Sequence, residues 1–201
     1  MSPRFLTPPA ARVIDTPAQA KDLYRRYPRE APPAAPATIA LDAPRLRQAG
    51  GAFTGLRRAW LHREDAPGRD IWGQARRVWQ QLLRGGRRLV WAGDCDDFAW
   101  QLLLILRAID GGRAFPRGAL RLTAGQAPQG GRLRGHLVLT IETEAGTVVL
   151  DSLQAGPLWS DDPAFARYRW QAREHGPVWV SLASVSLADA AAAAQARGAA
   201  T

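Results

Sequence analysis

The sequence is poor in cysteine and in long apolar runs, and both shortages limit what the protein can be. Cys95 is the single cysteine in 201 residues, so no disulfide forms within the chain, and the redox compartment stays open. No stretch approaches the ~20 continuous apolar residues of a membrane span. Segment 1–21 has no apolar signal-peptide core, because prolines interrupt it. We therefore expect neither a membrane span nor a conventional export signal.

Lysine is also nearly absent. Lys21 is the only one, so the net charge of +9 rests on arginine. Such an excess fits an anionic partner such as nucleic acid, or a G+C-rich coding bias that also favours Ala, Gly and Pro. The arginines are scattered and no run exceeds two, which favours the coding bias. Because no nucleic-acid-binding motif is recognisable, we do not expect a nucleic-acid partner.

What remains is typical of one folded domain with appendages. The chain is 46% hydrophobic and contains eight tryptophans, which indicates a globular protein with a substantial core. We divide it into a Pro-rich arm at 1–43, a domain at 44–185 and an Ala-rich tail at 186–201. Within the domain, helical patterns come first and strand patterns follow. This order predicts an α+β fold with an antiparallel sheet.

Periodicity and turn residues give approximate element boundaries. In the arm, prolines leave room only for a short helix at 16–26. Helices are expected at 43–48, 53–62, 70–84 and 95–109. The apolar stripe of the helix expected at 70–84 consists of Trp72, Ala75, Val78, Trp79 and Leu82, and Gly85 and Gly86 would end this helix. Strands are expected at 119–123, 136–141, 147–150 and 178–182, with a short strand or turn at 88–92, a strand or short helix at 168–172 and a loop at 125–131.

Residues 93–99, GDCDDFA, open the most apolar of these helices. Asp94 is a good N-cap, and Asp97 can complete a variant of the capping box. Cys95 is then the first helical residue, where free backbone N–H groups and the helix dipole favour a thiolate. A lone cysteine beside an apolar run is most often a core residue, so its meaning depends on partners elsewhere.

Those partners are found on the predicted hairpin. If it pairs symmetrically about its turn, with Ile141 opposite Gly146, then His136 lies opposite Asp151 with Cβ atoms ~5 Å apart. Asp151 would accept the Nδ1–H of His136 and direct Nε2 toward the sulfur of Cys95. A one-residue slip in register would spoil this pairing. The three residue types together predict thiol-dependent acyl transfer.

Three blocks carry a resemblance to a known family: GDCDDFA at 93–99, GHLVLT at 135–140 and VLDSL at 149–153. They resemble the signature blocks of the bacterial transglutaminase-like cysteine proteinases, which include the LapG-type proteases. The order Cys, His, Asp is also similar, and the resemblance covers about residues 70–182. It implies a papain/transglutaminase-like fold, with Cys95 as nucleophile, His136 as general base and Asp151 as its orienter. For the oxyanion hole we name only the Cys95 backbone N–H, with Trp91 as a neighbour.

The resemblance also implies a calcium site, because LapG-type enzymes use calcium beside the nucleophile. Its ligands here would be Asp94, Asp96 and Asp97. Negative charges beside a thiol raise its pKa, and a bound cation would cancel that effect. Oxygen-rich clusters suit calcium. The alternative is ordinary helix capping with an acidic first turn, which needs no metal.

We therefore expect a cysteine peptidase that acts on a protein or peptide substrate through an acyl-enzyme. A transglutaminase or amidase would use the same triad. A non-catalytic structural or binding protein, for example a phage component, is the alternative from another class, and an arginine-rich nucleic-acid binder is a third. The compact arginine-rich form resembles family members from phages, so we expect a cytoplasmic or phage-associated protein rather than a periplasmic one. The sequence predicts no oligomeric state.

Overall fold

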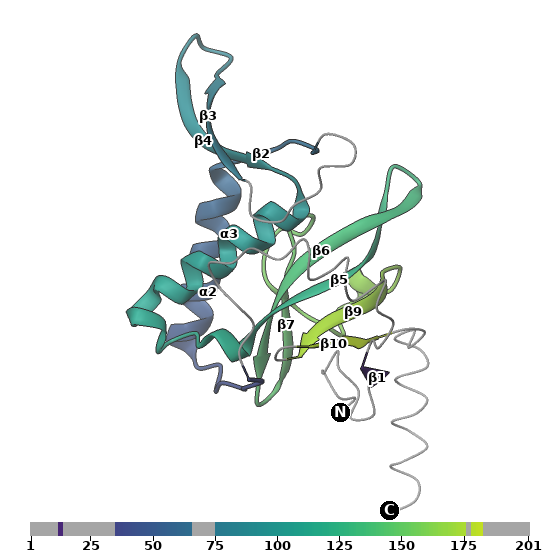
Figure 1. The fold of residues 1–201 in the computed structure, drawn as a ribbon. Helices are drawn as coiled ribbons and strands as arrows, with labels where there is room; N and C mark the ends of the chain where they lie inside the picture. The colour runs from purple at the N-terminus through teal and green to yellow at the C-terminus, as the bar shows by residue number, and fades with distance from the viewer. Residues whose placement is uncertain (1–11, 14–34, 66–74, 176–177, 183–201) are drawn as a thin grey trace, which may run out of the picture.

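A seven-stranded antiparallel sheet forms the centre of the molecule, with strand order β1-β10-β9-β5-β6-β7-β8. The computed structural model describes residues 12–13, 35–65, 75–175 and 178–182. Two α-helices among these residues, α2 and α3, lie beside the large sheet, and a small sheet of order β2-β4-β3 projects from one end (Figure 1). This is the expected α+β class.

The elements have the following bounds. The large sheet contains β1 (Arg12–Val13), β5 (Leu120–Gln129), β6 (Arg132–Thr143), β7 (Gly146–Leu150), β8 (Leu158–Trp159), β9 (Arg169–His175) and β10 (Val178–Ser181). The small sheet contains β2 (Trp60–His62), β3 (Arg76–Gln81) and β4 (Arg87–Gly93). The helices are α2 (Ala43–Arg58), α3 (Cys95–Ala108) and the short 3-10 turns η1 (Ile109–Gly112), η2 (Arg117–Ala119) and η3 (Pro163–Phe165).

Helix α2 is a single helix that begins at the N-cap Asp42, whose carboxylate accepts a hydrogen bond from Arg45 N at 2.8 Å. It buries Phe53 and Leu56 in the core, and this packing compensates for the weak helix propensity of its glycines. The predicted helix at 53–62 is wrong at its C-terminal end. Residues 60–62 form β2, which pairs in parallel with β4.

The predicted helix at 70–84 is also wrong. Residues 76–93 form the β3–β4 hairpin, in which Val78 lies opposite Val90 and Trp79 opposite Leu89. β-Branched and aromatic residues favour strands, and such pairs across a ladder stabilise it. Gly85, with φ +77°, belongs to the hairpin turn rather than to a helix stop. Residues 66–74 lie outside the described part of the chain.

The apolar face of β6 and β7 packs against α3, as the alternation predicts. The sheet side of this core consists of Leu137, Leu139, Ile141, Val148 and Leu150, and the helix side of Phe98, Leu102, Leu103 and Leu106. All nine are at most 4% exposed. Full burial of each such side chain contributes about 1.5–3 kcal/mol, so this contact holds α3, and the residue at its first position, firmly on the sheet.

The hairpin register differs from the prediction by two residues. Ile141 pairs with Val148 and Thr143 with Gly146, leaving a turn of only Glu144 and Ala145. Because a shift of two preserves the alternation, every side chain keeps the face assigned from sequence. The predicted loop at 125–131 is also wrong, because the strands extend further than expected. β5 and β6 pair as far as Gln129, and the turn is confined to Gly130 and Gly131.

The opposite face of β6 carries buried charges. Glu142 forms ion pairs with Arg173, at 2.7 Å, and with Arg121, at 3.3 Å. Burial lowers the pKa of Arg173 to about 10, although the charge of Glu142 opposes this. Paired charges thus fix the face of the sheet remote from α3. A second buried pair joins Arg117 and Glu174.

Part of the expected arm is described and lies along the domain. Ala37 N donates to Gly118 O and Ile39 N to Glu142 O, each at 3.1 Å. The helix expected at 16–26 and the tail at 186–201 lie outside the described residues. None of the described helices is long and apolar enough to cross a membrane.

Candidate active site

The first turn of α3 follows β4 directly and places Cys95 at its start, as predicted. Asp94 is the N-cap, and its Oδ1 accepts a hydrogen bond from Asp96 N at 3.2 Å. Asp97 is 1% exposed, and its side chain packs against Gly93. A Cβ at Gly93 would lie 2.6 Å from the Cβ of Asp97, so only glycine allows the strand to turn into the helix so closely.

The sulfur of Cys95 is held beside β6. The backbone N–H of Leu137 donates a hydrogen bond to it. Burial nevertheless raises the pKa of Cys95 to about 12, and the charges of the nearby aspartates Asp96, Asp94 and Asp151 raise it further. The expected preference of a helix N-terminus for thiolate is therefore outweighed, and the thiol is protonated at neutral pH.

His136 is the residue next to Leu137, and it is joined to Asp151. His136 Nε2 lies 2.7 Å from Asp151 Oδ1, and the two side chains are 1% and 0% exposed. Asp151 Oδ1 also accepts from Leu153 N at 2.8 Å, and Oδ2 accepts from the hydroxyl of Tyr168 at 2.7 Å. The carboxylate of Asp151 is thus an acceptor in all three hydrogen bonds.

This pattern fixes the tautomer of His136. Because a carboxylate only accepts, Nε2 carries a proton, and in the neutral ring Nδ1 has the lone pair. Among the described residues, His136 Nδ1 is buried without a hydrogen-bond partner. The prediction that Asp151 binds Nδ1 is wrong, because Asp151 contacts Nε2 and leaves Nδ1 without a partner. Leu137 places Cys95 beside β6, and Asp151 contacts His136 of the same strand from just beyond the end of β7.

Tyr168 was not identified from the sequence. Its hydroxyl donates to Asp151 and accepts from Gln154 Nε2 at 3.1 Å. Burial, followed by the charge of Asp151, raises the pKa of Tyr168, so the hydroxyl keeps its proton and remains a donor. Its ring packs against those of Phe165 and Trp170, with centroids 5.1 and 5.3 Å away. Nothing in the local sequence separates such a tyrosine from an ordinary strand-edge aromatic.

Trp91 gains no support as an oxyanion donor through its backbone, because Trp91 N donates to Ala59 O at 2.7 Å. The backbone N–H of Cys95, in the first turn of α3, keeps that role as a prediction.

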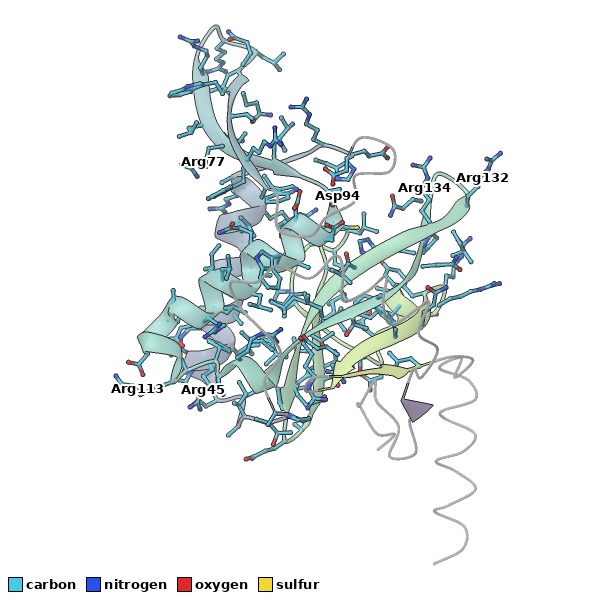
Figure 2. The ribbon with its side chains drawn as sticks, viewed as in Figure 1. Arg45, Arg77, Asp94, Arg113, Arg132 and Arg134 are labelled. Carbon is cyan, nitrogen blue, oxygen red and sulfur yellow. The ribbon has the colours of Figure 1, made fainter. Side chains whose placement is uncertain are left out.

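The acidic residues around Cys95 divide into two kinds. The carboxylates of Asp94 and Asp96 and the sulfur of Cys95 lie within 4.8 Å of one another, at the end of α3 where Figure 2 labels Asp94. Asp97 does not belong to this group, because its carboxylate is turned toward Gly93. Two carboxylates suit a hard cation such as Ca²⁺, whereas the neutral thiol does not add a ligand for it.

Comparison with known families identifies the family of this chain. The model of the bacterial transglutaminase-like cysteine proteinases (BTLCP) matches residues 68–186. The chain belongs to this family. The match spans β3 to β10 and therefore includes Cys95, His136 and Asp151. A comparison with curated proteins found no significant match.

Solved structures of Legionella pneumophila LapG resemble this family member. The calcium-bound form is 21% identical over 75% of this chain and 78% of that chain, with a TM-score of 0.45. A second structure of LapG is 20% identical over 75% and 76%, with a TM-score of 0.44. The EGTA-treated form is 22% identical over 63% and 61%, with a TM-score of 0.41.

Proposed function

We propose that this family member is a cysteine peptidase whose nucleophile is Cys95. The observation that carries the proposal is the hydrogen bonding of His136: Asp151 holds Nε2, while Nδ1 has no hydrogen-bond partner among the described residues. A buried imidazole with one nitrogen occupied and the other available is the arrangement that a general base requires. Leu137 brings the thiol to the same strand.

The reaction follows from these roles. The Cys95 sulfur attacks the carbonyl carbon of the substrate as its proton passes to His136 Nδ1, and the carbonyl oxygen becomes an oxyanion. The imidazolium returns the proton to the amine as the C–N bond breaks, which leaves a thioester. Water, deprotonated by Nδ1, then hydrolyses the thioester and restores the thiol. Asp151 stabilises the imidazolium in both halves of the cycle.

The raised pKa of Cys95 favours this concerted proton transfer over a preformed thiolate–imidazolium pair. The oxyanion would form near the start of α3, where the N–H groups of the first turn have no partner within the helix. A carboxylate-rich surrounding alone would oppose the developing negative charge, and a bound calcium ion would offset that effect.

We infer a calcium site made by Asp94 and Asp96, whose carboxylates lie together beside the sulfur. A bound divalent cation would offset their charge and lower the pKa of the thiol. Backbone carbonyls and water would have to complete the ligand set, since Ca²⁺ takes 6–8 oxygens. Asp97 stays a predicted ligand from the family resemblance, although its carboxylate packs against Gly93 in this structure.

The proposal is tested with a proteome-derived peptide library. The wild type and Cys95→Ser are incubated with the library in calcium, and new N-termini are identified by mass spectrometry. Cleavage by the wild type that Cys95→Ser abolishes supports a peptidase. Equal profiles would contradict it. A parallel reaction with a fluorescent primary amine separates the two acyl acceptors: incorporation of the amine in place of hydrolysis would identify a transglutaminase.

A further inference from the structure

The β3–β4 hairpin is a projecting ribbon with a one-sided charge. It extends away from the large sheet and the helices, at the top of the molecule in Figure 1. Residues 76–93 contain no aspartate or glutamate. They contain five arginines, namely Arg76, Arg77, Arg84, Arg87 and Arg88. The scatter of arginines along the sequence therefore conceals a local concentration of positive charge.

The same ribbon exposes large apolar side chains. Leu83 is 108% exposed, Trp79 64%, Leu82 40% and Leu89 37%. These are four of the seven large hydrophobic residues that are exposed in the described part of the chain. Leu82 and Leu83 lie in the turn, closed by the hydrogen bonds Leu82 N to Gly86 O and Gly85 N to Leu82 O. Leu83 is thus fully exposed at the tip of a projecting turn, with Leu82 partly exposed beside it.

Aromatic rings and arginines share one face of the ribbon. Trp79 pairs with Leu89, and Arg77 pairs with Trp91, so their side chains project together. The guanidinium of Arg77 lies 4.9 Å from the Trp91 ring, and that of Arg87 lies 5.8 Å from the Trp79 ring. These are cation–π distances, and they hold the arginines beside the apolar surface. Figure 2 shows the side chains crowding this ribbon.

We propose that the β3–β4 ribbon binds the surface of membranes that contain anionic phospholipids. Leu82 and Leu83 would enter the acyl-chain boundary, Trp79 would lie at the headgroup level, and the arginines would contact phosphates. Apolar insertion combined with a basic collar is the combination that gives reversible membrane attachment. Nucleic acid would satisfy the arginines but would leave two leucines at the turn in water. A lipid surface accounts for both features.

The test is co-sedimentation of the full chain carrying Cys95→Ser with large vesicles, so the result does not depend on catalysis. Vesicles of phosphatidylcholine alone are compared with vesicles in which about a quarter of the lipid is phosphatidylglycerol. The protein should sediment with the anionic vesicles only, and less so as salt rises. Arg87→Gln with Arg88→Gln should weaken binding about 25-fold, at roughly fivefold per charge. Leu83→Ser should weaken it about tenfold.

Matched controls separate the ribbon from the overall charge. Arg47→Gln with Arg113→Gln removes the same charge from exposed sites elsewhere, and Leu46→Ser removes an exposed leucine from α2. These controls should bind as the parent does. Equal losses in ribbon and control variants would overturn the proposal, and so would absence of binding. Binding of a fluorescent duplex DNA in place of vesicles would assign the ribbon to nucleic acid. Dimers in sedimentation velocity that Leu83→Ser dissociates would assign it to a second copy.

Discussion

His136 and Asp151 reach each other diagonally across the β6–β7 ladder. Nε2 and Oδ1 are 2.7 Å apart although the last paired residues of these strands are Leu139 and Leu150. Asp151 reaches the imidazole because it lies just beyond the end of β7, where Leu153 N and Tyr168 fix its carboxylate. The orientation of the His136 ring therefore depends on the surroundings of Asp151.

Asp151→Asn tests that dependence. An amide can donate to Nε2, which would favour the wrong tautomer and remove the charge that stabilises the imidazolium. We expect kcat to fall about 10²- to 10⁴-fold. Hydrolysis of a peptide selected from the library measures it. Asp162→Asn, which alters an aspartate that caps η3, is the matched control and should retain full activity.

Tyr168→Phe removes only the hydroxyl that donates to Asp151. Hydrogen bonds to charged groups contribute about 1.5–3 kcal/mol, so we expect a fall in kcat of roughly 10- to 100-fold. KM should stay unchanged, because Tyr168 positions Asp151 rather than the substrate. Steady-state kinetics separates the two constants. A change confined to KM would show that Tyr168 does not act through the triad.

Removing calcium should slow the alkylation of Cys95. Since the pKa of Cys95 is raised to about 12, the thiol is neutral at pH 7, and chelator should give slow alkylation. Calcium would lower that pKa and increase the rate. Asp94→Asn removes one of the charges that raise the pKa, so it should speed alkylation in chelator while abolishing the response to calcium. Iodoacetamide kinetics measures both effects, and Asp97→Asn tests that residue separately. An unaltered calcium response in Asp94→Asn would contradict the site.

Gly93→Ala should displace the first turn of α3. The added methyl would lie 2.6 Å from the Cβ of Asp97, too close to the helix backbone for an easy adjustment. We expect a loss of about 1–3 kcal/mol in the free energy of unfolding. Gly55→Ala is the control: nothing lies within 4 Å, and alanine in α2 should stabilise by up to ~1 kcal/mol. Urea denaturation distinguishes the two signs.

Glu142→Gln should destabilise the fold without touching the site. It would leave the buried guanidinium groups of Arg173 and Arg121 without their anion, and losing one partner of a buried pair costs about 3–5 kcal/mol. Glu144→Gln, in the exposed β6–β7 turn, should have no effect. Equal stability of the two variants would contradict the account of this face.

The sequence predicts best where local chemistry and burial agree. Asp94, the apolar run after it and the alternation of β6 identify α3 and the sheet face that packs against it. Prediction from the sequence fails where pairing with a distant strand decides the secondary structure. The tryptophan-rich segment before Cys95 satisfies a helical stripe and a hairpin equally well, and only its pairing with β4 selects the strand. The ring nitrogens of His136 depend on the diagonal approach of Asp151, which register arguments do not resolve.

The most direct test of the Cys95–His136 pair is the rate of iodoacetamide alkylation at neutral pH in saturating calcium, with wild type and His136→Ala. The chain has a single thiol, so every adduct reports on Cys95. We predict that the histidine variant reacts at least about tenfold more slowly, because no base takes the proton. Equal rates in the two folded proteins would contradict the account.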